Sequence, residues 1–219
     1  MDAIPARTVM IAGASGLVGR ELLAGLLADG SVTAVHSLGR RELGVSHPKL
    51  TQHRVDFSQA LPALSGVDEA FIALGTTIKV AGSQEAFRAV DHDAVIAVAQ
   101  AAKSAGARRL GVVSAMGADT KSSLFYSRIK GETEQALASL GFDTLVIARP
   151  SMLAGDRASL GQQVRGGEEL AVKVSRWFGS LIPANYRSIP AASVARALLH
   201  AVPVSKGRRV MLSGELREY

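Results

Sequence analysis

The chain has 219 residues, of which 47% are hydrophobic, and this suits one α/β domain with a full core. It has no cysteine, which excludes disulfides, cysteine nucleophiles and thiolate metal sites and favours a cytoplasmic location. The net charge of +6 comes from scattered basic residues that form no basic helix face, so we expect no nucleic acid partner. No apolar run reaches about 18 residues, so we expect no membrane span.

The stretch Thr8–Leu27 is predicted to be a strand, a glycine-rich turn and a helix. An apolar run, Val9–Ala12, is followed by Gly13, Gly16 and Gly19, and leucines then recur at helical spacing. In this context the first glycine allows a sharp exit from the strand, the second lets a ligand approach the backbone, and the third lets the helix pack closely on the sheet.

The start of that helix is predicted to bind an anion. The free N–H groups of a helix N-terminus favour negative charge, such as that of a pyrophosphate. The alternative is a glycine-rich turn of an α/β protein without a ligand. We predict a dinucleotide cofactor in contact with Gly13, Ser15, Gly16, Leu17, Val18 and Gly19.

The second strand is predicted at Ser31–Leu38, and two arginines follow it. In doubly wound folds this position meets the adenosine ribose, and an acidic residue there would bind the 2′-hydroxyl of NAD. Arg40 and Arg41 instead suit the 2′-phosphate of NADP, so we favour NADP over NAD. Glu42 weakens this interpretation, and a solvated arginine pair at a strand end is the alternative.

The middle of the chain continues the alternation of strands and helices. A strand over Glu69–Leu74 ends in a polar run in which a glycine lets the chain pass beside the cofactor and hydroxyls can reach it. The residues of this run that we assign to the cofactor are Leu74, Gly75 and Thr76. A single helix is predicted over residues 83–105, with Ser83 as its N-cap and Gly106 after its end.

The remaining elements complete a Rossmann-type doubly wound parallel sheet in one domain, residues 1–219, with a small C-terminal lobe from about residue 151. Residues 151–168, rich in glycine, arginine and glutamine, are expected to form a mobile segment over the site. The other predicted strands are Leu50–Asp56, Leu110–Ser114, Thr144–Ala148 and Arg208–Leu212, and the other helices are Leu124–Leu140, Leu170–Phe178 and Ala191–Val202.

Tyr126 and Lys130 stand four residues apart, so a helix places them on one face. A tyrosine hydroxyl is a weak acid near pH 7, and a nearby ammonium group stabilises its phenolate. Tyr126 can then donate a proton to a carbonyl or accept one from an alcohol. Ser114, at a strand end, can bond the same oxygen, although Ser122 and Ser123 are alternatives for that hydroxyl. The alternative for the pair is a surface tyrosine packed on a lysine stem.

The motifs GASGLVG, GRR, LGTT, VDHD, VVSAMGA, Y-x-x-x-K-G-E and RPSMLAG occur in this order along the chain. The spacing G-x-x-G-x-x-G and the order of the other motifs resemble the short-chain dehydrogenase/reductase superfamily in its extended and atypical branches. The runs LGTTIKVAG, GAD and WFGSLIP narrow the resemblance to the Tat-interactive-protein oxidoreductase group and its bacterial relatives.

This resemblance implies roles for individual residues. Ser114, Tyr126 and Lys130 would be the catalytic triad, with Lys130 also holding the nicotinamide ribose. Pro150 and Leu153 would line the nicotinamide. The adenine would lie near Asp56 and Phe57, although Asp56 could equally be a helix cap. The residues that would bind NADP(H) include Gly13, Gly16, Gly19, Arg40 and Arg41.

The sequence lacks one residue of the classical short-chain dehydrogenases, which have a further catalytic asparagine on the helix after the fourth strand. The only asparagine is Asn185, far downstream, so a water or another side chain must take its place. The five histidines lack metal-ligand spacing, so we expect no metal. The resemblance also makes a homodimer through the helices at residues 83–105 and 124–140 an expectation.

Together these observations predict an NADP(H)-dependent oxidoreductase that acts on a small carbonyl or alcohol, with Tyr126 as acid and base. Two alternatives stay open: a nucleotide-sugar epimerase or dehydratase, and a non-catalytic regulatory protein that senses NADPH. About seventy C-terminal residues are few for a sugar-nucleotide lobe, which argues against the first alternative.

Overall fold

The computed structural model describes residues 6–154 and 188–219. The predicted helix Leu170–Phe178 and most of the predicted mobile segment at residues 151–168 lie outside the described residues. None of the described helices is long and apolar enough to cross a membrane.

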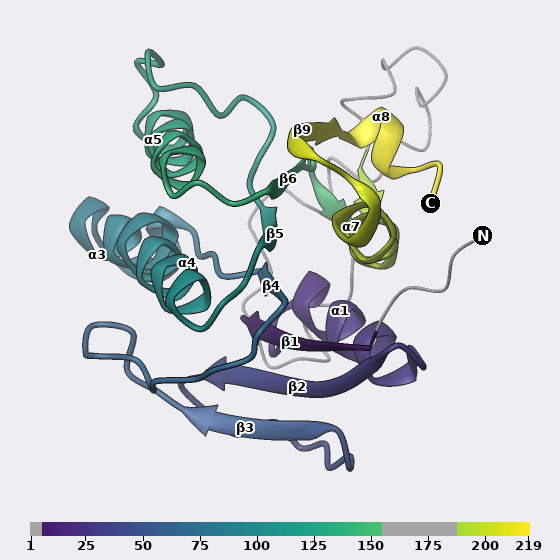
Figure 1. The fold of residues 1–219 in the computed structure, drawn as a ribbon. Coiled ribbons are helices and arrows are strands. Elements are labelled where there is room, and N and C mark those ends of the chain that lie inside the picture. Colours follow the sequence, from purple (N-terminus) through teal and green to yellow (C-terminus); the bar gives the residue numbers. More distant parts are fainter. Residues whose placement is uncertain (1–5, 155–187) are drawn as a thin grey trace.

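Seven parallel strands form one sheet in the order β3-β2-β1-β4-β5-β6-β9, with helices on both faces (Figure 1). This confirms the predicted doubly wound fold. The chain leaves β1 in one direction towards β2 and β3, and β4 then begins on the other side, so the strand order reverses between β1 and β4. The strands of this sheet are β1 (Arg7–Ala12), β2 (Val32–Gly39), β3 (Leu50–Arg54), β4 (Glu69–Ile72), β5 (Arg109–Val113), β6 (Thr144–Arg149) and β9 (Gly207–Leu212).

The C-terminal part of the chain contributes to the main body. β9 extends the sheet beside β6, and α7 packs against α1, while β7 (Leu153–Ala154) and β8 (Ile189–Pro190) form a separate pair. The longer helices are α1 (Leu17–Ala28), α4 (Ala94–Ser104), α5 (Phe125–Ser139) and α7 (Ala191–Val204). The short ones are α2 (Ile78–Ala81), α3 (Gln84–Arg88) and α8 (Ser213–Leu216).

Each face of the sheet has its own apolar core. Val9 and Ile11 of β1 pack in the core that contains α1 and α7, whereas Met10 and Ala12 pack in the core that contains α4. Successive side chains of a strand point to opposite faces, so a strand covered on both faces must be apolar throughout. This explains the continuous apolar run from which the first strand was predicted.

The single helix predicted over residues 83–105 is wrong in one respect. Ser83 does cap its start, accepting a hydrogen bond from the Ala86 backbone N–H at 3.1 Å, and Gly106 follows its end with φ +108°. Between α3 and α4, however, residues 89–93 form a π-helical segment, η1. Such segments add a residue to a helical turn and often occur at functional sites. Here the segment contains the buried Asp91.

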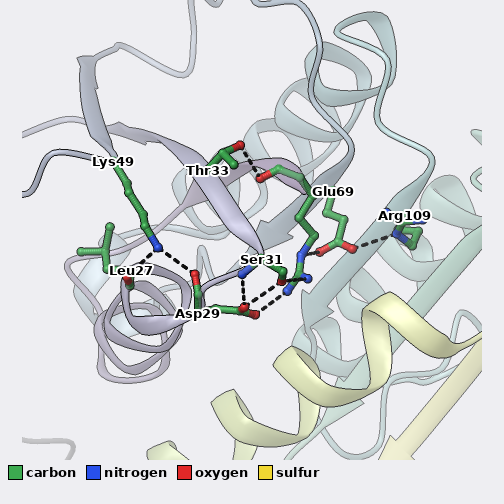
Figure 2. A network of polar contacts seen from close by, with 8 residues as sticks. Leu27, Asp29, Ser31, Thr33, Lys49, Glu69 and Arg109 are labelled. Atoms are coloured by element: carbon green, nitrogen blue, oxygen red, sulfur yellow. Dashed lines mark hydrogen bonds and ion pairs between the residues drawn. The ribbon is translucent and has the colours of Figure 1, made fainter. Parts of the chain in front are cut away.

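A charged network ties together the amino ends of the central strands (Figure 2). Glu69, at the start of β4, is fully buried between Arg7 Nε at 3.0 Å and Arg109 Nε at 2.8 Å. Burial is the largest influence on Glu69 and raises its pKa, while the two guanidinium groups act in the opposite direction. Arg7 also bonds Asp29 at 2.8 Å. Buried charges need such partners, so this network serves the fold at the edge opposite the strands' carboxyl ends.

Candidate active site

A cavity of about 1180 Å³ opens at the carboxyl ends of the central strands. Its lining includes Gly13 after β1, Arg40 after β2, Ala73 after β4, Ser114 after β5 and Pro150 after β6. Doubly wound sheets bind their ligands here, where the strand order reverses. All of the site residues predicted from the sequence line this cavity except Gly19.

The glycine turn forms the floor of the cavity under the start of α1. Gly13 has φ +89°, and a Cβ on it would lie 2.6 Å from the Ala73 backbone. A Cβ on Gly19 would lie 2.0 Å from Gly13 O, so this glycine serves the packing of α1 on the turn. Gly16 differs, because its extended backbone suits any residue and the nearest atom to an added Cβ is 3.4 Å away. The space beside Gly16 is therefore open to a ligand.

Three arginines border the end of the cavity beside β2 and β3. Arg40 and Arg41 are exposed, and Arg54 of β3 pairs in register with Gly39 immediately before them. Asp56 accepts hydrogen bonds from the Ser58 N–H at 2.9 Å and the Ser58 hydroxyl at 2.8 Å. These bonds, with a smaller effect of the Arg40 charge, lower the pKa of Asp56. Asp56 therefore caps a turn rather than the helix that was the alternative to its contact with the adenine.

Tyr126 and Lys130 both lie in α5 and both line the cavity, as the spacing predicted. The Tyr126 ring packs on the buried Phe87 of α3, with 5.4 Å between the ring centroids. Lys130 Nζ lies 2.7 Å from Asp91 Oδ1, and the other oxygen of Asp91 accepts the Thr76 N–H at 2.8 Å. Asp91 thus links Lys130 to the loop after β4.

Ser114 also lines the cavity, but its hydroxyl is already bonded. It donates to Glu134 Oε1 at 2.6 Å, and Glu134 is 2% exposed. Arg149 donates to both oxygens of Glu134, through Nε at 2.9 Å and Nη2 at 2.6 Å. These hydrogen bonds raise the pKa of Arg149. A carboxylate held by a guanidinium therefore lies directly behind the serine.

The sequence analysis missed Asp91 and Glu134, although both carried a signal. Glu134 follows Lys130 by four residues, as Lys130 follows Tyr126, so the three residues lie along one side of α5. Asp91 belongs to the VDHD run at the place where an asparagine was missing. Asp91 lies in the π-helical segment, which the apolar pattern did not predict.

The sequence matches the model of a protein family described as NAD(P)H-binding over residues 13–203. It is 38% identical over 203 residues to protein HTATIP2 of Rattus norvegicus, a match that covers 89% of this chain and 80% of the rat protein. It is also 38% identical over 158 residues to an Emericella nidulans protein named "Protein fmp52, mitochondrial", covering 68% of each. The resemblance based on the sequence motifs is thereby confirmed.

Solved structures show the same fold at low identity. WbmH of Bordetella bronchiseptica, in complex with NAD⁺, superposes with a TM-score of 0.70 at 18% identity and covers 97% of this chain and 79% of its own. A short chain dehydrogenase family protein of Francisella tularensis superposes with a TM-score of 0.67 at 12% identity, covering 96% of this chain and 98% of its own. These neighbours support the Rossmann fold.

Proposed function

Because this chain belongs to the NAD(P)H-binding family and is a homologue of HTATIP2, we propose that it is an NADP(H)-dependent oxidoreductase acting on a small carbonyl or alcohol. One observation carries the proposal: Tyr126, Lys130 and Ser114 border the same cavity as the glycine turn. A proton donor beside a cofactor site is what the reduction of a carbonyl needs.

Three features of the cavity lining support the proposed dinucleotide with a 2′-phosphate. The start of α1 offers backbone N–H groups to a pyrophosphate, and Gly16 leaves room beside them. Arg40 and Arg41 would bind the 2′-phosphate, because planar guanidinium groups match its oxygens. Pro150 and Leu153, at the other end of the lining, would contact the nicotinamide. When bound, the nicotinamide supplies or accepts a hydride.

Side chains of the cavity would transfer the proton and hold the reacting groups in place. Tyr126 donates its phenolic proton to the substrate oxygen in reduction and accepts it in oxidation. Lys130 places a positive charge on the same face of α5, which stabilises the phenolate, and Asp91 holds the ammonium group in place. Phe87 fixes the tyrosine ring by contact.

An assay of reductase activity tests this proposal. The purified chain is mixed with NADPH or NADH and a panel of aldehydes and ketones, and cofactor oxidation is followed by absorbance. We expect turnover with NADPH that is lost in Tyr126→Phe. Tight NADPH binding without turnover on any substrate would contradict the proposal and favour a regulatory protein that senses NADPH.

Two further expectations from the sequence remain proposals. We propose a cytoplasmic location on the absence of cysteine, and imaging of the tagged protein tests it against the mitochondrial location in the name of the fungal relative. We also propose a homodimer through the helices at residues 83–105 and 124–140, which light scattering on the purified chain tests.

A further inference from the structure

The hydrogen bond between Ser114 and Glu134 has a fixed direction. A serine hydroxyl carries one proton and two lone pairs, whereas an ionised carboxylate can only accept. The O–O distance of 2.6 Å is that of a charge-assisted bond. If Glu134 is ionised, the single proton of Ser114 must therefore lie between Ser114 Oγ and Glu134 Oε1.

Two guanidinium groups surround the carboxylate of Glu134. Arg149 donates two hydrogen bonds to its carboxylate, and Arg208 Nη2 lies 3.3 Å from Oε2. Glu134 is almost completely buried, so these two guanidinium groups take the place of water. Both arginines come from neighbouring strands, β6 and β9, which makes the arrangement part of the sheet.

Ser114 borders the cofactor cavity as well as contacting Glu134. With its proton directed at Glu134, the hydroxyl has only lone pairs left for the cavity. A group that meets Ser114 Oγ from the cavity must then be a hydrogen-bond donor. A carbonyl oxygen is not a donor, but the hydroxyl of an alcohol is.

We propose that Glu134 is a positioning residue that fixes Ser114 as a hydrogen-bond acceptor, so that the site binds the alcohol form of its substrate in preference to the carbonyl form. This inference rests on the proposed oxidoreductase function. While Tyr126 is a neutral phenol, the alcohol O–H donates to Ser114 Oγ and the alcohol oxygen accepts from Tyr126. In oxidation the alcohol O–H turns to the Tyr126 phenolate, which accepts the proton. A carbonyl receives its hydrogen bond from Tyr126 alone, so the oxidised form is bound less tightly.

Neutron diffraction from crystals of the full chain tests the direction of the bond without a substrate. The expected result is a deuteron on Ser114 Oγ that points at Glu134 Oε1. A deuteron that points into the cavity, or one that lies on Glu134, would overturn the inference. This measurement remains decisive even if the chain proves to have no oxidoreductase activity.

Kinetics with p-nitrobenzaldehyde and p-nitrobenzyl alcohol test the consequence. In Glu134→Gln, the amide places its oxygen at the Oε2 side, where two arginine groups donate, rather than at the Oε1 side, where only Arg149 Nε donates, and turns its NH₂ towards Ser114. Ser114 then accepts from the amide and donates into the cavity. We expect the ratio of the aldehyde KM to the alcohol KM to fall by about tenfold, the effect of one hydrogen bond of ordinary strength.

Two controls separate this role from a structural one. Glu69→Gln makes the same change in a carboxylate buried between two arginines at the opposite edge of the sheet, and it should leave the KM ratio unchanged. The double variant Ser114→Ala/Glu134→Gln should also have the same KM ratio as Ser114→Ala alone. If Glu134→Gln does not fold, Glu134→Asp keeps the charge but retracts it from Ser114, and the same fall is expected.

These experiments distinguish a failure of the positioning role from a failure of the proposed oxidoreductase function. The positioning role would be overturned if the KM ratio of Glu134→Gln equalled that of the wild type. It would also be overturned if Glu134→Gln lowered the ratio by the same factor in the Ser114→Ala background. Failure to turn over any carbonyl or alcohol would instead contradict the proposed function, while the neutron map still decides the direction of the Ser114 hydroxyl.

Discussion

Lys130 Nζ lies 2.7 Å from Asp91 Oδ1 with both side chains buried, so the positive charge beside Tyr126 is balanced inside the protein. Breaking a buried pair by removing one charge leaves the other uncompensated, which costs about 3 kcal/mol or more. We expect Asp91→Asn to lower the free energy of unfolding in urea by about this amount.

The same substitution should change the pH dependence of turnover. An unbalanced ammonium group stabilises a nearby phenolate more strongly, so the pH at which turnover changes should move down in Asp91→Asn. Asp93→Asn is a matched control, since that side chain is 59% exposed. A variant of Asp91 with wild-type stability and an unshifted pH profile would show that the pair has neither role.

The second prediction concerns the proposed proton donor. Tyr126→Phe keeps the ring on Phe87 and removes only the hydroxyl, so NADPH affinity should be nearly unchanged. Turnover should fall by roughly two to four orders of magnitude. Lys130→Met should differ by weakening NADPH binding as well. Tyr219→Phe, at the C-terminus, should have no effect on either quantity, and wild-type turnover in Tyr126→Phe would refute the acid–base role.

A third prediction concerns cofactor choice. Replacing Arg40 and Arg41 by alanine should remove most of the preference for NADPH over NADH, because the paired charges on the 2′-phosphate are lost. Titrating both cofactors against wild type and variant measures this. Arg20→Ala, an arginine of α1 outside the cavity lining, should keep the preference. Equal affinity of the wild type for the two cofactors would contradict the assignment.

Gly16→Val should abolish NADPH binding while the fold survives. Its backbone, with φ −86° and ψ 171°, suits any residue, but the branched side chain would occupy the space of the pyrophosphate. Circular dichroism and a cofactor titration report the two effects separately. Gly30→Val, where an added Cβ meets nothing within 4 Å, should leave binding intact. Normal binding in the Gly16 variant would place the cofactor elsewhere.

A histidine pair on β2 and β3 predicts how stability depends on pH. His36 Nδ1 and His53 Nε2 lie 3.0 Å apart, and burial lowers the pKa of both, with the His36 charge adding to the effect on His53. The unfolded chain then binds more protons than the folded chain below about pH 6.5. We therefore expect stability to fall as the pH drops through this range.

Urea unfolding at several pH values checks this sign. His53→Gln should reduce the pH dependence between about pH 5 and 6.5, because one titrating group is removed and its partner no longer faces a second ring. His200→Gln, at an exposed position, is the control. An undiminished slope in His53→Gln would show that other groups cause the dependence.

Most of the fold could be predicted because its signals are local. The apolar runs, the glycine turn and the helical spacing of Tyr126 and Lys130 each depend on a few neighbouring residues. The strand bounds were less accurate: the strand expected over Glu69–Leu74 ends at Ile72, since the following residues turn along the cavity. The short helix α2, capped by Thr77, was not predicted either.

The charged partners of the site were harder to predict, because they come from distant parts of the chain. Ser114 follows β5, Glu134 lies in α5 and Arg149 ends β6, and only the folded sheet brings them together. The sequence indicated that Ser114 borders the site, but gave no sign that its proton is directed away from the cavity. Similarly, nothing in the pattern of residues 83–105 distinguished a π-helical turn from a regular one.

The π-helical turn at residues 89–93 affects which side chains of the helix face the active site. Phe87, Asp91 and Val95 are spaced by four residues, more than the 3.6 of a regular α-helix, yet all three are buried. The wider turn absorbs the difference. Deleting one residue between 89 and 93 would restore regular winding, because the π-helical turn holds one residue more than a turn of an α-helix. The wider turn thus joins the segment whose Phe87 contacts Tyr126 to the segment that begins α4, and it carries the Asp91 carboxylate that contacts Lys130.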